Sequence, residues 1–181
     1  MRRSWSATLA LAVLTVAVGA GITSAQGVTQ PGGDRDFVAR AAMSNMAAIQ
    51  LGHLATKKAQ SADVKQFAQA TIDDHVKAQQ QLADAASGAG VQWPKKLDDR
   101  HQQIAQRLSK LRNDEFDREF VKAIVEGHRD VEKMLAGRAS THPGEDTLGA
   151  KVNQWAASTL PDVQAHLKEA EQVLARIGQG E

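Results

Sequence analysis

Apolar residues recur at intervals of three or four along most of this chain, and this spacing predicts amphipathic helices. No stretch alternates between apolar and polar residues, and no Asn-Gly pair marks a hairpin turn. The 181 residues include only 4 Pro and 4% aromatic side chains, which favours helices over a sheet. We therefore expect an all-α fold, in which two long helical hairpins and a short connecting helix share one core as an antiparallel four-helix bundle.

Capping and breaking residues divide the chain into these helices. Ser61 and Asn113 are expected to cap the two helices that follow them, because a short polar side chain can bond to free backbone N–H groups. The run Gly88-Ala89-Gly90 should stop the second helix. Pro161 lacks a backbone donor and is expected to kink or split the last helix, which Gly178 ends.

The N-terminus is typical of an export signal. Arg2 and Arg3 precede a nearly continuous apolar run from Ala7 to Ile22, and small residues follow up to Ala25. An uncleaved membrane anchor is the alternative, but this run is shorter than the roughly 20 apolar residues needed to cross a bilayer. We therefore expect a cleaved signal peptide at 1–25 and a protein exported to the periplasm or the cell envelope.

The remaining chain is expected to comprise a flexible leader at 26–33 and one helical domain at 34–178. Without residues 1–25, which hold two arginines and no acidic residue, the 22 basic and 21 acidic residues become 20 and 21. Such a balance offers no basic face for nucleic acid. The absence of cysteine excludes disulfides, thiolate metal sites and cysteine nucleophiles. An envelope component or another protein remains as a partner class, and the sequence indicates no oligomeric state.

Histidines on the inward faces of the expected helices are the candidate site residues. His75 precedes Gly88 by nearly the same number of positions as His128 follows Asp114. If those two helix ends meet at the same end of the bundle, the two histidines differ in height by about 1.5 Å. The sequence therefore predicts that His75 and His128 lie side by side.

A third histidine is expected at a different level. His166 lies farther beyond Gly144 than His75 lies beyond Ser61, which places His166 about 12 Å lower when both are counted from helix starts. Asp74 is expected near the pair. The candidate metal ligands are thus His75, His128, His166 and Asp74, with one transition-metal ion as the cofactor, whereas His53 is displaced and His101 and His142 are expected to be solvated.

The histidine pair leaves three functions open. An inward histidine can bond a neighbouring carbonyl or carboxylate and fix helix register without a ligand, it can bind a metal, or it can act as an acid or base. Di-iron chemistry is disfavoured, because Ile72 and Val163 stand three residues before His75 and His166, where Glu-x-x-His motifs need glutamate. The sequence favours a non-enzymatic structural or interaction role, with mononuclear metal binding or handling as the alternative.

Several motifs also resemble a known family over roughly residues 34 to 176. They are Phe37 to Ala59, Val64 to Ala68, Asp74-His75, Phe116 to Val121, Glu126 to His128 and Leu160 to Leu167. In this order they are similar to the exported bacterial proteins of the domain of unknown function 4142 family. The resemblance implies a ferritin-like helical bundle in the periplasm or envelope, and no established activity. Related sequences often carry a glutamate in the first helix where this chain has Ala48 and Gln50.

Overall fold

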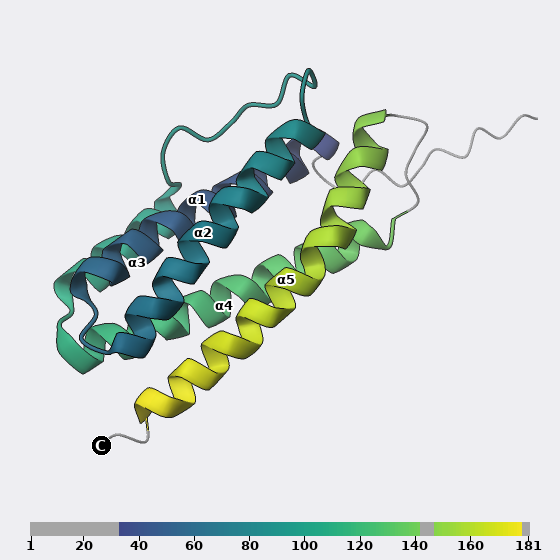
Figure 1. The fold of residues 1–181 in the computed structure, drawn as a ribbon. Helices are drawn as coiled ribbons and strands as arrows, with labels where there is room; N and C mark the ends of the chain where they lie inside the picture. The colour runs from purple at the N-terminus through teal and green to yellow at the C-terminus, as the bar shows by residue number, and fades with distance from the viewer. Residues whose placement is uncertain (1–32, 142–146, 179–181) are drawn as a thin grey trace, which may run out of the picture.

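The computed structural model describes residues 33–141 and 147–178, and every regular element in that part of the chain is a helix. The expected all-α fold is therefore confirmed, whereas the expected signal peptide lies outside the described residues. The described residues form four long helices and a shorter one, and in Figure 1 the long helices lie along one another with the shorter one beside them. The helices are α1 (Asp34–Lys58), α2 (Ala62–Ala85), α3 (Asp99–Lys110), α4 (Asn113–Ala139) and α5 (Thr147–Gly178).

The long helices pack as two hairpins. α1 packs mainly against α2 and α4 mainly against α5, and the hairpins meet where α2 contacts α5 and α1 contacts α4. The short helix α3 lies against α1 and α4. The chain between α2 and α3 runs along the outside of the hairpins in Figure 1, so it carries the chain back from one end of the structure to the other.

Two apolar clusters fill the core, one toward each end. The first cluster joins the N-terminal parts of α2 and α4 to the C-terminal part of α5, through residues that include Val64, Phe67, Phe116, Phe120, Ala170 and Val173. The second joins the opposite ends of the same three helices to the N-terminal part of α1, through residues that include Phe37, Leu82, Leu135, Val152 and Trp155. Consequently α2 runs parallel to α4 and antiparallel to α5.

The helix boundaries follow the expected residues, but the capping chemistry differs. Ser61 precedes α2, yet its side chain makes no capping bond. Instead the buried carboxylate of Asp117 accepts hydrogen bonds from the backbone N–H groups of Gln60 and Ser61, the shortest at 2.7 Å. Asn113 is the first residue of α4 rather than its cap, and it adopts a φ of 52°.

Glycines and one proline shape the remaining turns. Gly88 and Gly90 take φ angles of 75° and 67° after α2 ends, a conformation that glycine adopts without steric cost. Pro161 lies inside α5, which continues to Gly178 without a break. Figure 1 shows α5 changing direction along its length, as expected for a helix with an internal proline.

Within the part of the chain that the structure describes, no helix combines the length and the apolar character needed to cross a membrane.

Candidate metal centre

Three histidines from three helices meet between the two apolar clusters. His75 of α2, His128 of α4 and His166 of α5 each offer one nitrogen, and these atoms all lie within 4.8 Å of one another. The ring centroids are 5.3 to 5.7 Å apart. His75 and His128 are buried, with relative exposures of 7% and 4%, and the side chain of His166 is 13% exposed. Three imidazoles therefore share one small, largely buried space.

Each ring is held from outside the cluster by an oxygen atom. His75 Nδ1 lies 3.0 Å from Asn45 Oδ1, and His128 Nδ1 lies 3.0 Å from the backbone oxygen of Ile124. His166 Nε2 lies 2.8 Å from Asp74 Oδ2. Outer hydrogen bonds of this kind fix the ring orientation and the tautomer of metal-binding histidines.

These partners determine which ring nitrogens carry hydrogen. A backbone carbonyl only accepts, so Nδ1 of His128 is the N–H donor and its Nε2 carries a lone pair. Asn45 donates through Nδ2 to Gln79 Oε1 at 3.2 Å, which orients Oδ1 as the acceptor from His75 Nδ1. The Nε2 atom of His75 is then also a bare acceptor, and on His166 it is Nε2 that donates to Asp74.

The two bare Nε2 atoms of His75 and His128 face each other at 3.4 Å. Two acceptors cannot form a hydrogen bond, so this contact needs a proton or a cation between or beside the rings. Burial, followed by the neighbouring histidines, lowers the pKa of His75 from 6.5 to about 3. Burial and His166 together lower the pKa of His128 to about 4, although the bond to Ile124 opposes the shift. Both rings are therefore neutral at pH 7.

The spacing suits coordination of one ion. A tetrahedral ion with metal–nitrogen distances near 2.0–2.1 Å separates its ligand nitrogens by about 3.4 Å. The separation of the Nε2 atoms of His75 and His128 has this value, 3.4 Å. The remaining nitrogen, on His166, lies within 4.8 Å of the other two and needs a shift of up to about 1.4 Å to complete a three-nitrogen face.

The expected level of His166 is wrong, because α2 and α5 run in opposite directions. The expected offset came from counting both helices from their starts. Counted from the shared end of the structure, His166 precedes Gly178 by nearly the same number of positions as His75 follows Ser61. The remaining difference in height is only about 3 Å.

The proximity of His75 and His128 is confirmed, although the expected pairing of helix ends is not. The two helices run parallel, so the start of α4 lies beside the start of α2. The expectation had placed it beside the end of α2. His75 follows Ser61 by nearly the same number of positions as His128 follows Arg112. Both histidines are near the middle of their helices, which is why either way of counting brings them together.

The other polar candidates lie outside the three-histidine cluster. Asp74 does not point into the cluster beside His75, because neighbouring residues on a helix point about 100° apart. It contacts the outer nitrogen of His166 instead. His53 is exposed. His101 is half-buried rather than solvated and pairs with Asp98 at 2.7 Å, and His142 lies outside the described residues.

Sequence reasoning missed the role of Asn45, the buried amide that orients His75. Asn45 is 6% exposed. Its signal is available in the sequence, since it follows Ala41 by four residues and precedes Ala48 by three, on the inward stripe of α1. Gln79, which in turn orients Asn45, gives no comparable signal.

Hollows in the surface reach the cluster from two sides. One of about 440 Å³ lies among α1, α3 and α4 and is lined by both His75 and His128. The other, of about 310 Å³, is lined by His75, His166 and Asp74. The cluster is thus buried but not sealed.

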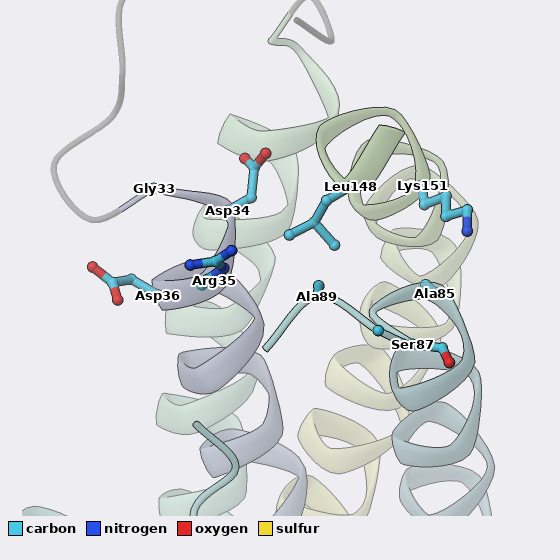
Figure 2. Close-up of a pocket in the computed structure, with 10 residues that line it drawn as sticks. Gly33, Asp34, Arg35, Asp36, Ala85, Ser87, Ala89, Leu148 and Lys151 are labelled. Atoms are coloured by element: carbon cyan, nitrogen blue, oxygen red, sulfur yellow. The ribbon is translucent and has the colours of Figure 1, made fainter. Parts of the chain in front are cut away.

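A further hollow lies at the end of the structure, where α1 starts and α2 ends. Figure 2 shows its lining, with the charged ends of Asp36 and Lys151 on opposite sides and pointing apart. Gly33 and Ser87 also line it, and both are exposed. The charged ends of Asp36 and Lys151 therefore do not converge on one point in this hollow.

Comparison with known proteins identifies a family and a fold. The sequence model of a family described as a domain of unknown function (DUF4142) matches residues 20–173. No curated protein sequence matches the chain at a significant level.

Two solved structures share the fold. One is a DUF305 fragment from Deinococcus radiodurans, with a TM-score of 0.68 and 16% identity, covering 82% of this chain and 98% of the fragment. The other is a DUF305 protein from Streptomyces coelicolor assigned as secreted, with a TM-score of 0.64 and 13% identity, covering 80% of this chain and 92% of that one. At these identities the likeness is one of fold.

Proposed function

The chain belongs to the DUF4142 family, and we propose that its function is to bind a single transition-metal ion through His75, His128 and His166. The observation that carries the proposal is the pair of buried Nε2 atoms of His75 and His128, two acceptors that face each other at 3.4 Å. A buried polar atom without a partner costs about 1–3 kcal/mol. A bound cation would accept a lone pair from each Nε2 atom and so remove this cost.

The donor set indicates the class of metal. Three neutral imidazoles suit Zn²⁺, Cu²⁺, Ni²⁺ or Fe²⁺ and are poor ligands for Ca²⁺ or Mg²⁺, which prefer oxygen. Three protein ligands leave a further coordination position open, as in zinc sites where water or a substrate takes the fourth position. Because the cluster lacks bridging carboxylates, the site would hold one ion, and a di-iron centre remains disfavoured.

We also propose that the protein works outside the cytoplasm as an antiparallel four-helix bundle of the ferritin-like kind. The N-terminal sequence supports export, and so does the secreted assignment of the Streptomyces coelicolor protein with the same fold. The antiparallel packing within each hairpin supports the bundle. A metal-handling role in the periplasm or envelope fits this location and needs no catalytic residue.

The test is a titration of the metal-free full chain with Co²⁺, followed by absorption spectroscopy and displacement with Zn²⁺. We expect one Co²⁺ per chain with the d–d bands of a four-coordinate nitrogen-rich site, and their loss in His128→Gln. His53→Gln is the control, because it removes an exposed histidine from the same protein. A purely structural histidine pair would give no stoichiometric Co²⁺ binding, and that result would reject the proposal.

A further inference from the structure

The hollow of about 440 Å³ among α1, α3 and α4 has the size and lining of a small-molecule site. α3 covers it as a partial roof. The buried residue of α3 is Leu108, near its C-terminal end, whereas Arg100, His101 and Ile104 of its N-terminal part line the hollow.

The inner wall of this cavity is apolar except at one place. Ala47, Ala48 and Leu51 of α1 and Ala123 and Ile124 of α4 are buried and line it. The exception is the pair His75 and His128, which are buried and line the same cavity. An apolar ligand body would therefore contact aliphatic walls while its head group reaches the proposed metal ion.

The mouth of the cavity does not by itself select the charge of a ligand. Arg100 pairs with Asp130 at 2.8 Å, and His101 pairs with Asp98 at 2.7 Å. Arg40 and Glu126 add one charge of each sign. The charge of the ligand would be selected at the inner end of the cavity, where His75 and His128 lie.

The charge at the inner end favours an anion. A divalent ion on three neutral imidazoles carries two positive charges, and Asp74, bonded to the outer nitrogen of His166, contributes one negative charge. One positive charge would be left in a largely buried place, where an unbalanced charge is costly. A single carboxylate in the open coordination position would balance it.

We propose that this cavity binds a monocarboxylate with a short apolar chain, whose carboxylate coordinates the metal ion held by His75, His128 and His166. This inference rests on the proposed function, because without the ion the inner wall presents only two hydrogen-bond acceptors. Those acceptors disfavour a carboxylate, so binding must depend on the metal.

The test is calorimetric titration of octanoate into the full chain, with Zn²⁺ and without it. Octanoate is expected to bind the Zn²⁺-loaded protein at least tenfold more tightly than the metal-free protein. Octanol and octylamine, which have the same chain, should show no such gain. X-ray absorption at the zinc edge should show an oxygen ligand added when octanoate is present.

A variant that fills the cavity distinguishes octanoate binding in this cavity from octanoate binding elsewhere on the protein. Ala48→Phe places a ring in the cavity and should abolish octanoate binding while Zn²⁺ still binds, whereas Ala136→Phe, on the exposed face of α4, should change neither. If Ala48→Phe does not fold, the zinc-edge spectrum of the unsubstituted protein with octanoate is the test. An added oxygen ligand supports the carboxylate site, and no added oxygen ligand overturns it.

The outcomes separate the two proposals. Binding of Zn²⁺ with equal octanoate affinity in both forms, or with no new oxygen ligand, overturns the carboxylate site and leaves the metal site standing. Failure to bind Zn²⁺ at all overturns both.

Discussion

His75 and His128 present lone pairs to each other across 3.4 Å in the protein core, each fixed by a hydrogen bond on its other ring nitrogen. This arrangement costs stability in the metal-free protein, since neither acceptor is satisfied by the other. Groups that are unfavourable for folding but well placed for a ligand are typical of functional sites. The pair should therefore behave as part of a binding site rather than as a structural contact.

Replacing His128 with leucine should stabilise the metal-free protein while removing metal binding. The substitution eliminates one of two unsatisfied acceptors and retains apolar packing, and the expected gain is about 1 kcal/mol in the free energy of unfolding. Urea denaturation in the presence of a chelator measures it. Were the pair a purely structural device, His128→Leu would instead lower the stability.

The metal-free protein should lose stability as the pH falls below about 6.5. Burial lowers the pKa of His75 to about 3 and of His128 to about 4, so between pH 6.5 and these values the unfolded state binds more protons than the folded state. Stability is therefore complete above pH 6.5 and declines toward pH 3–4, by up to about 1.4 kcal/mol per pH unit for each histidine.

Urea denaturation at a series of pH values checks this slope. His75→Gln should flatten it, whereas His53→Gln, which removes an exposed histidine, should leave it unchanged. An equal slope in His75→Gln would show that the buried histidines do not cause the acid sensitivity.

Asp74→Asn should weaken metal binding about 10- to 100-fold without loss of the fold, because a carboxylate on the outer nitrogen of a histidine ligand orients the ring and raises its basicity. Asp73→Asn is a matched control: Asp73 is exposed, as Asp74 is, but accepts a hydrogen bond from Gln69 on its own helix. Competition with a chromophoric chelator gives both affinities. Equal affinity in the two variants would remove Asp74 from the site.

Gly52→Ala should destabilise the protein, because α1 and α2 approach closely at this glycine. A Cβ atom there would lie 2.6 Å from Cγ1 of Ile72 and 3.2 Å from the backbone oxygen of Ala68. Overpacking of this kind costs about 1–3 kcal/mol. Thermal unfolding measures the loss.

Gly127→Ala provides the opposite case. Nothing lies within 4 Å of the added methyl group, and alanine is the better helix former by about 1 kcal/mol. Gly127→Ala should therefore match or exceed the parent stability, and a similar loss in both variants would contradict the role given to Gly52.

Local signals in the sequence were sufficient for the helices but not for their directions. The apolar spacing, Gly88 and Gly178 mark helices and their ends, since these signals act through neighbouring residues. Whether α4 runs parallel or antiparallel to α2 depends on the chain between them, which returns along the outside of the structure before α3. No local pattern encodes that path.

The same limit decided what could be predicted of the site. The inward faces of α2 and α4 identified His75 and His128 from periodicity alone. The contribution of His166 required the relative direction of α2 and α5, and the position of Asp74 outside the cluster required the rotation of α2 about its axis. These are properties of tertiary packing, which a single sequence does not display.

Anomalous diffraction at the zinc edge, from crystals of the full chain grown with Zn²⁺, tests the metal site most directly. One peak is expected about 2.1 Å from Nε2 of His75, Nε2 of His128 and Nδ1 of His166. A structure with the three imidazoles in place and no anomalous peak among them would contradict the metal site.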